Sequence, residues 1–379
     1  MSFVPPPVPE PPDPFLMPPA ERDEDQPAAP RVFRPFPLHP HFGWAILWCI
    51  AMMLMTAAPA IVVAVVYIFV LTIAVPDAID TNQPLMNNRQ FQVAIGLATW
   101  FQHLLIILMS LLVLRVVAGK NWLREVAVRL PSLSHVGLVV VLTPAVLVLG
   151  NAVMTLLHDR LGWPTMFDPK KMEGLGDIEQ LFTSWPLAIT VFVIAVMPGL
   201  SEELWCRAFL GRGLVGIHGY VAGVLMTSFF FGLIHMDLCQ GTMAALMGII
   251  LHYVYLTTRS LVAPMLLHFF NNATSVYLSR LPEAKNFELK GESEVLIYLA
   301  AGFILAAVAY ALYESRARLV ATDGGVPWQP PHPGVSCPPA GSNTIVVAPT
   351  PSLLAVFMVL LSLAAFGAVV AAIIAKTIK

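Results

Sequence analysis

The sequence predicts an all-α fold, a polytopic bundle of transmembrane helices. Of the 379 residues, 57% are hydrophobic and only 12% are charged, whereas soluble domains carry roughly 25% charged residues. Apolar runs long enough to cross a bilayer recur along the chain, and they lack the period-2 alternation of a membrane β-barrel. We therefore expect an integral membrane protein with about eight core helices and an extra C-terminal transmembrane helix.

Residues 1–40 differ from the rest of the chain, because they are rich in proline and acidic residues and contain no apolar run. A segment of this composition cannot bury enough apolar surface to offset the entropy lost on ordering. It also lacks the apolar centre of a cleavable signal peptide. We expect a disordered cytoplasmic tail, whose proline runs could dock a partner.

Nine apolar segments follow this tail. Eight of them form the expected core at residues 41–313, and a Pro/Gly-rich linker at 314–351 leads to the ninth, a C-terminal transmembrane helix within 352–379. Six of the expected spans lie at about residues 42–75, 91–118, 136–157, 242–256, 295–313 and 352–375. The fourth span begins near residue 186 and runs into the glutamates at 202–203, the fifth ends at about 229–235, and the seventh begins near 261.

Charge at the ends of these spans predicts the orientation, because lysine and arginine favour the cytoplasmic side. Basic residues precede span one, follow spans two, six and eight, and lie at the end of span four. All of these ends fall on one side if the N-terminus is cytoplasmic, and the loops on the other side are net acidic. We expect both ends of the core in the cytoplasm, in a bacterial plasma membrane.

Two glutamates and an arginine interrupt the fourth apolar segment, in the run EELWCR at residues 202–207. A charged side chain at the bilayer centre costs roughly 2.5–3.5 kcal/mol on insertion scales, so these groups need partners, water or a function. Glu203 and Arg207 are four residues apart and suit an internal ion pair. Glu202 points about 100° away from Glu203, which leaves it as a candidate general base. Structural salt bridging by both glutamates is the alternative for this motif alone.

Two later segments carry the other candidate site residues. Phe231 and His235 are four residues apart in the fifth segment, and His268 and Asn272 are four apart in the seventh, so each pair shares a helix face. A histidine can order a water, accept its proton or bind a metal, and an imidazole with an amide can donate hydrogen bonds to an oxyanion. The alternatives are an interfacial histidine and ordinary interhelical hydrogen bonding.

Several other polar residues in these segments are given plainer interpretations. Cys206 is interpreted as a packing residue, and Asn271 as a structural neighbour of the site. Asp237 could orient His235 or could be a loop residue. Packing or helix bonding is the interpretation for three further histidines, His103, His158 and His252.

Local backbone features are expected to place these groups. Pro198 lies just before the glutamates and is expected to kink its helix and aim the carboxylates inward. A fifth helix that began at His218 would carry His235 about 26 Å deep, since each residue adds about 1.5 Å. The Gly-rich stretch at residues 211–223 instead predicts a start near Val224, which brings His235 to the depth of Glu202.

In chain order, the three motifs read EExxxR, FxxxH and HxxxN, each on a hydrophobic segment. This pattern resembles the CPBP family, which includes type II CAAX prenyl endopeptidases, Abi proteins and lysostaphin-resistance-protein-A-like proteins. The resemblance covers about residues 186–278 and implies an intramembrane protease. The family's first motif reads EExxFRG, whereas Cys206 and Ala208 flank the arginine here, a departure that touches packing and not charge.

The resemblance also implies roles for the motif residues. Glu202 and His235 would activate the attacking water, and His268 and Asn272 would form the oxyanion site. Glu203, Arg207 and Phe231 would support them.

The need for a metal is left open by the residues. If a metal binds, zinc is the candidate, and His235, His268 and Glu202 are its candidate ligands. The sequence has no HExxH motif, however, and Glu202 acting as a base leaves no spare carboxylate. We expect a glutamate-type mechanism that requires no cofactor, with a metalloprotease as the alternative.

The predicted function is therefore an intramembrane endopeptidase that acts near the cytoplasmic face. Its expected partners are membrane lipid and a peptide or lipidated protein, such as a C-terminal, prenylated CAAX-type peptide. No basic face suggests nucleic acid, because the net charge is −2. The four cysteines form no CxxC pair, which argues against a thiolate metal site or a disulfide framework.

Two other functions are weighed against the protease. One is a non-proteolytic scaffold or bacteriocin-immunity protein that keeps the same fold. The other is a proton-coupled transporter, which should show an inverted repeat that the sequence lacks.

Overall fold

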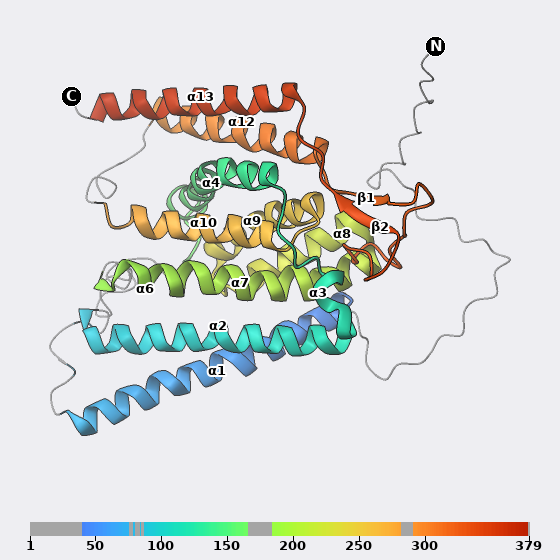
Figure 1. The fold of residues 1–379 in the computed structure, drawn as a ribbon. Helices are drawn as coiled ribbons and strands as arrows, with labels where there is room; N and C mark the ends of the chain where they lie inside the picture. The colour runs from blue at the N-terminus through green and yellow to red at the C-terminus, as the bar shows by residue number, and fades with distance from the viewer. Residues whose placement is uncertain are drawn as a thin grey trace, which may run out of the picture. The chain divides into compact units, whose positions relative to one another are not determined.

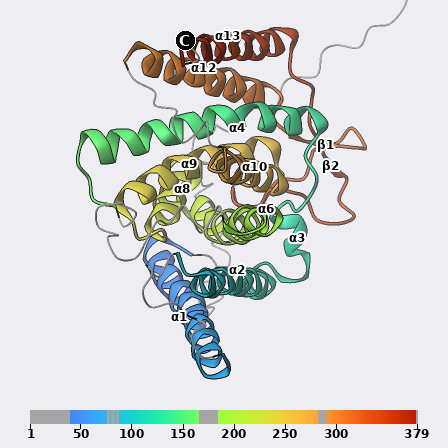
Figure 2. The same ribbon diagram turned by 90° about the vertical axis from the view of Figure 1, so that its left-hand side faces the viewer.

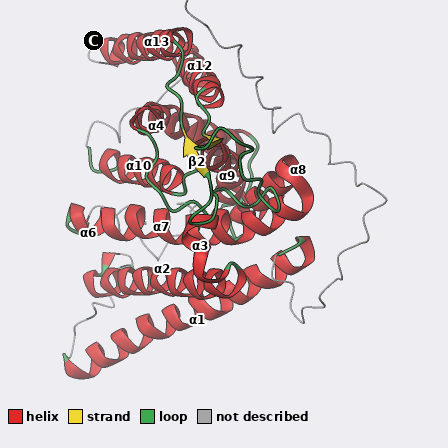
Figure 3. Cartoon of the chain, turned by 45° about the vertical axis from the view of Figure 1, so that its right-hand side comes forward, coloured by secondary structure: helices red, strands yellow, loops and turns green. Residues whose placement is uncertain are grey.

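The computed structural model describes residues 40–75, 79, 84, 87–165, 184–281 and 291–377. Within these residues the chain is almost entirely helical, and seven helices are long and apolar enough to cross a membrane. Strands occur only in one short hairpin (Figure 3). The predicted all-α polytopic fold is confirmed, whereas the expected tail at residues 1–39 lies outside the described part of the chain.

The nine expected spans correspond to helices in this structure. Two differences account for the smaller count of seven. Spans four and five are counted as one 47-residue stretch, Leu187–Leu233, although the helix is broken inside it at Gly219, and span seven is α10, which has only 17 residues. The long helices are α1 (Phe42–Ala74), α2 (Arg89–Val117), α4 (Leu133–Met154), α8 (Arg212–Leu233), α9 (Leu238–Thr258), α10 (Val262–Leu278), α12 (Glu292–Glu314) and α13 (Leu353–Thr377).

The helices lie roughly side by side in layers (Figures 1 and 2). Helices α1 and α2 pack together at one edge, and α12 and α13 pack together at the opposite edge. Between these edges lie α4, α8, α9, α10 and the helix that carries the two glutamates. Large apolar side chains of the edge helices remain exposed, such as Leu54 and Phe69 of α1 and Phe357 of α13. Such surfaces are suited to contact with lipid.

Side-chain caps explain where several helices begin. The Asn88 side chain accepts hydrogen bonds from the backbone N–H groups of Gln90 and Phe91 at the start of α2. Ser132 accepts from the N–H of His135 at the start of α4. These oxygens satisfy donors that the first helical turn leaves without a partner. The proline in the first span does not break it, because α1 is continuous through Pro59.

The helix that carries the glutamates is wider than a regular α-helix in two places. It starts as α6 (Leu187–Val191) and passes through a π-helical turn, η5 (Phe192–Val196), into α7 (Met197–Glu203). A second π-helical stretch, η6 (Leu204–Gly211), follows at once and leads into α8. π-Helical turns are rare and occur frequently at functional sites. Here they flank the two glutamates on both sides.

The chain reverses direction inside α8. Gly219 has φ 78° and ψ 177°, a backbone conformation that glycine tolerates, and the helix is broken there. The two arms then meet closely, since a Cβ on Gly223 would lie 2.4 Å from the Cα of Val215. The second arm therefore begins after Gly219, about one turn before the predicted start near Val224.

The predicted linker is folded over one end of the bundle. Strands β1 (Arg318–Ala321) and β2 (Thr344–Val347) form an antiparallel hairpin, with Arg318 opposite Val347. We call residues 317–347 the cap. It is joined to the core by hydrogen bonds from Ala317 N to Thr257 O (2.7 Å) and from Ser336 N to Glu125 O (2.9 Å). Glu125 belongs to the short helix α3 (Trp122–Glu125), which lies at the same end of the bundle (Figure 1).

Candidate active site

Glu203 and Arg207 form the predicted ion pair. Arg207 Nη1 donates to Glu203 Oε1 over 2.8 Å, and both side chains are fully buried. Arg207 Nη2 also donates to the carbonyl of Gly248 in α9 (3.2 Å). The guanidinium carbon lies 4.5 Å from the centroid of the Phe231 ring, a cation–π contact. These contacts tie the glutamate-bearing helix to α8 and α9.

Helix α10 approaches this pair closely. Gly199 lies one turn before Glu203, and a Cβ at this glycine would lie 3.3 Å from the carbonyl oxygen of Met265. The small residue allows the backbones of α7 and α10 to come together. His268 of α10 consequently reaches Glu203, with Nδ1 2.9 Å from Glu203 Oε1. The same carboxylate oxygen therefore contacts both Arg207 and His268.

Glu202 differs from Glu203 in both contacts and exposure. Its Oε2 lies 3.8 Å from His268 Nε2, and 15% of its side chain is exposed, against 0% for Glu203. In the described part of the chain, no hydrogen bond to the Glu202 carboxylate is formed. The structure thus separates a sequestered carboxylate from an accessible one, as the two helix faces predicted.

His235 lies just past the end of α8 and contacts Phe231. The two rings are 5.2 Å apart, and His235 Nδ1 is 2.8 Å from the carbonyl oxygen of Phe231. A carbonyl oxygen can only accept, so Nδ1 carries the proton and a neutral ring has its lone pair on Nε2. The Phe231 ring also lies 6.0 Å from the His268 ring. Phe231 is therefore in ring contact with both motif histidines.

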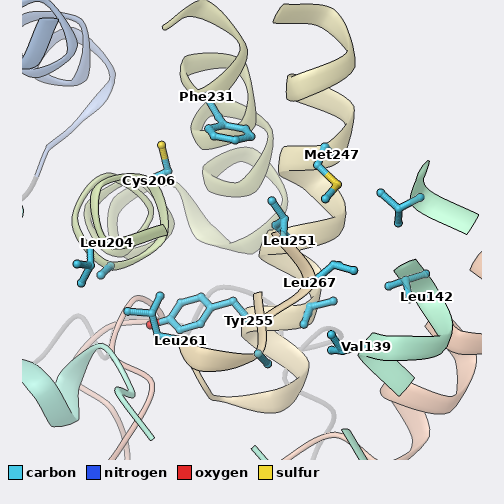
Figure 4. Packing of buried hydrophobic residues seen from close by; sticks show 14 of the residues in the cluster. Val139, Leu142, Leu204, Cys206, Phe231, Met247, Leu251, Tyr255, Leu261 and Leu267 are labelled. Atoms are coloured by element: carbon cyan, nitrogen blue, oxygen red, sulfur yellow. The ribbon is translucent and has the colours of Figure 1, made fainter. Parts of the chain in front are cut away.

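The buried hydrophobic packing brings the same elements together (Figure 4). Cys206 from η6, Phe231 from α8 and Met247 and Leu251 from α9 lie in one hydrophobic cluster. Cys206 is 0% exposed, which agrees with its interpretation as a packing residue.

Asn272 is held by two hydrogen bonds. Its Nδ2 donates to the carbonyl of Ile194 in the π-turn η5 (3.0 Å), and its Oδ1 accepts from Asn271 Nδ2 (3.1 Å). The first bond joins α10 to the glutamate-bearing helix at η5, the π-helical turn that precedes α7. Asn271 is therefore a structural neighbour, as predicted. These contacts hold Asn272 beside η5, and its oxyanion role stays a prediction.

His103 of α2, interpreted from the sequence as a packing or helix-bonding residue, lies beside the glutamates. Its Nδ1 lies 2.8 Å from the hydroxyl oxygen of Ser201, which directly precedes Glu202. The ring is also within electrostatic range of Glu202, His235 and His268. A lone histidine in an apolar helix gave no sequence pattern to suggest this. Only the packing of α2 against α7 brings it to the glutamates.

Other candidate residues have structural partners. Asp237 is the N-cap of α9, where it accepts from the N–H of Gln240 (2.7 Å) and from the hydroxyl of Thr165 (2.9 Å). This bears out the loop-residue alternative. His252 is 1% exposed and lies against Gly211, as expected for packing. His158 Nδ1 contacts the carbonyl of Trp163 at 3.2 Å.

The part of the chain that the structure describes contains no ready-made metal site. No three His, Cys, Asp or Glu residues in that part of the chain lie together in a way that could hold a metal ion. A catalytic zinc site has three protein ligands. Glu202, His235 and His268 thus do not form a preassembled zinc site here. The four cysteines are free and buried.

Comparison with known proteins gives one match. Residues 184–274 match the family described as Type II CAAX prenyl endopeptidase Rce1-like. A search of curated proteins and a search of solved structures gave no match. The matched range contains Glu202, His235, His268 and Asn272, and it nearly coincides with the predicted region at 186–278. The family supports a protease, and together with the seven apolar helices it indicates an integral membrane protein. The resemblance that the three motifs indicated is therefore confirmed for residues 184–274, which match the family described as Type II CAAX prenyl endopeptidase Rce1-like.

Proposed function

We propose that this chain is an intramembrane endopeptidase that hydrolyses a peptide bond of a membrane-associated or C-terminal peptide. The family match supports a protease, and its name supports prenylated CAAX-type peptides as the substrate class. Lipid-facing apolar helices around the site would let a lipidated peptide reach it from the membrane.

The observation that carries the proposal is the difference in burial and in contacts between two adjacent glutamates. Glu203 is buried and bound by Arg207 and His268, so its charge is already committed. Glu202 is partly exposed and only approaches His268, at 3.8 Å. A general base must be reachable by the water that it deprotonates. Of the two carboxylates, only Glu202 meets this requirement.

The reaction then uses water as the nucleophile. Glu202 accepts one proton from the water while the water oxygen attacks the carbonyl carbon of the substrate. His235 offers a lone pair at Nε2 that can accept the second O–H of the water as a hydrogen bond. The carbon–nitrogen bond breaks next, and the proton on Glu202 passes to the amine that leaves.

Stabilisation of the oxyanion is assigned to His268 and Asn272. His268 Nδ1 donates to Glu203 when that carboxylate is ionised, so its Nε2 can donate only from the protonated ring. Asn272 uses one N–H on Ile194 and has a second that can donate. Each donor of this kind contributes roughly 2.7–4 kcal/mol in other enzymes.

No cofactor is required in this proposal. Zinc remains the alternative, and Glu202, His235 and His268 would be its ligands after rearrangement. Metal analysis of the purified, active protein tests the point. A stoichiometric metal whose removal abolishes turnover and whose return restores it would contradict the glutamate-type mechanism.

The test uses the purified full-length chain and a quenched peptide that ends in a prenylated cysteine motif. Turnover is measured for the wild type, for Glu202→Ala, and for Glu292→Gln as a control at an exposed glutamate of α12. We expect turnover by the wild type and the control, and a loss of about 10²–10⁴-fold in Glu202→Ala. The same peptide without its lipid shows whether the lipid is recognised.

Two outcomes contradict the proposal. Equal turnover by the wild type and Glu202→Ala would remove Glu202 as the base. Failure of the wild type to cleave any peptide tested would favour a non-proteolytic scaffold with this fold.

A further inference from the structure

A histidine outside the family motifs, His103, lies near Glu202 together with His268. His103 lies near the middle of α2, about 21 Å from either end at 1.5 Å per residue, in a helix that is otherwise strongly apolar. Polar groups at such a depth mark function by default. His103 also lies outside the matched residues 184–274, so the family motifs give it no role.

The ring of His103 is oriented by Ser201. Ser201 is fully buried, whereas His103 is partly exposed, so the Nδ1 edge faces the protein interior. Nε2 lies on the opposite edge of the imidazole, and no described residue makes a hydrogen bond with it. The ring is within electrostatic range of Glu202, His235 and His268. The ring of His103 therefore lies beside the same site.

The three histidines differ in where a neutral ring can hold its proton. His235 Nδ1 faces a carbonyl and His268 Nδ1 faces a carboxylate, and both acceptors draw the proton to Nδ1. The partner of His103 Nδ1 is a hydroxyl, which can donate as well as accept. His103 is thus the one imidazole of the three that can be neutral, bonded at Nδ1 and still carry a proton on Nε2.

Peptide hydrolysis needs such a donor. When water adds to the carbonyl carbon, the carbonyl oxygen gains a negative charge, and fixed N–H groups stabilise that charge. His268 can supply one only from a charged ring. A neutral donor beside Glu202 avoids placing a further charge in an apolar environment.

We propose that His103 is a further catalytic residue, which donates a hydrogen bond from Nε2 to the carbonyl oxygen of the substrate. Ser201 positions it by donating to Nδ1. The proton stays on His103 throughout, so the transfers between water, Glu202 and the leaving amine are unchanged. The inference rests on the proposed peptide hydrolysis and adds a donor from α2 to it.

The test compares variants of the full-length protein that keep or lose the donor. His103→Gln retains an N–H near the position of Nε2, and His103→Leu removes it. His103→Phe keeps an aromatic ring but has no donor, and it replaces His103→Leu if the leucine variant does not fold. The matched control is His135→Leu, which removes a buried histidine of α4 that bonds the carbonyl of Ser315, at the cap end of the bundle.

We expect His103→Leu and His103→Phe to lower kcat by about 10²–10³-fold, the usual effect of losing one oxyanion donor. KM should change little, because the interaction forms only in the transition state. His103→Gln should retain more activity than either. Affinity for a peptide aldehyde, whose hydrate resembles the tetrahedral intermediate, should fall in parallel with kcat/KM. His135→Leu should keep its turnover per folded molecule.

Results that contradict the role of His103 can be distinguished from results that contradict the proposed peptide hydrolysis. If the wild type cleaves, Glu202→Ala does not, and His103→Leu or His103→Phe cleaves normally, the hydrolase stands and the role of His103 falls. Equal losses in the glutamine and leucine variants, without loss of aldehyde affinity, would also overturn it. If the wild type cleaves nothing, both proposals fall together.

Discussion

Arginines serve different purposes at the two glutamates and at the cap. Arg259 donates to the carbonyls of Ala317 (3.2 Å) and Ser336 (2.8 Å), which holds the cap against the core. Arg207 instead pairs with the carboxylate of Glu203, which also contacts His268. Backbone carbonyls have no proton to exchange. At the glutamates, nearly every contact involves a group that can gain or lose one.

The difference separates structural polar groups from candidate catalytic ones. At the cap, backbone carbonyls accept from Arg259, and nothing in these two contacts could drive a reaction. At the site, Glu203 and Arg207 pair with each other, which leaves Glu202, His103 and His235 with accessible acceptor or donor atoms. Burial alone therefore does not identify the site, and the kind of partner does. Three predictions test this distinction.

The largest effect is expected from Arg207→Met. The change leaves Glu203 as a buried carboxylate without its cationic partner, which destabilises proteins by about 3–5 kcal/mol. The control is Arg160→Met, which breaks the pair with Glu294, in which 59% of the arginine side chain is exposed. Only 11% of the Glu294 side chain is exposed, but the arginine end of the pair is solvated, so the loss should be smaller than for the fully buried pair. Thermal and denaturant unfolding in detergent measure both.

A double variant sharpens the result. Glu203→Leu combined with Arg207→Met removes both charges, and apolar replacement of a buried pair is often neutral for stability. The double variant should therefore unfold later than Arg207→Met. If Arg207→Met were no less stable than Arg160→Met, the Glu203–Arg207 pair would not be the structural element assumed here.

A smaller effect is expected where α8 folds back on itself. A Cβ in Gly223→Ala would lie 2.4 Å from the Cα of Val215, so the two arms must separate. Such overpacking costs about 1–3 kcal/mol, and the shift should displace His235 and lower turnover. Gly302→Ala in α12 is the matched control, because no atom lies within 4 Å of its added Cβ. Unchanged turnover in a folded Gly223→Ala would contradict the dependence of His235 on this reversal.

The smallest effect concerns the cap and pH. Burial and the nearby charge of Arg212 lower the pKa of His332 to about 4 from its ordinary 6.5. His332 Nδ1 also accepts from the N–H of Gly334 (3.2 Å), a bond that protonation of Nδ1 would break. The folded cap therefore binds this proton less readily than the unfolded chain. Its contribution to stability is present above about pH 6.5 and is lost as the pH falls towards about 4.

Unfolding temperatures of the wild type and His332→Gln test this effect. The wild type should lose more stability than the variant between about pH 7.5 and about pH 5. Equal losses in both proteins would show that His332 does not couple the cap to pH.

Local sequence spacing predicted much of the site. The i,i+4 rule placed Glu203 beside Arg207 and Phe231 beside His235, because both contacts form within one helix or at its end. The motif order also predicted the approach of His268 to Glu202. The hydrogen bond from His268 to Glu203 was not foreseen, since it depends on how closely α10 lies against Gly199.

Contacts between distant segments could not be read from spacing. His103 comes from α2 and meets Ser201 across almost a hundred residues, which only tertiary packing determines. The cap was expected to be a Pro/Gly-rich linker. Its order could not be foreseen, because it comes from contacts with Thr257, Glu125 and Arg259 and not from its own apolar content. The start of the second arm of α8 was predicted about one turn late, because the Gly-rich stretch offers several glycines and only Gly219 takes the break.

The most direct test of the central claim compares Glu202→Gln with Glu203→Gln, measuring turnover per folded molecule and thermal unfolding for each. Glu202→Gln should lose about 10²–10⁴-fold in turnover. It should unfold like the wild type, because no described residue forms a hydrogen bond with the Glu202 carboxylate. Glu203→Gln should unfold earlier, because Arg207 and His268 lose their charged partner. Turnover by Glu202→Gln at the wild-type rate would contradict the assignment of Glu202 as the base.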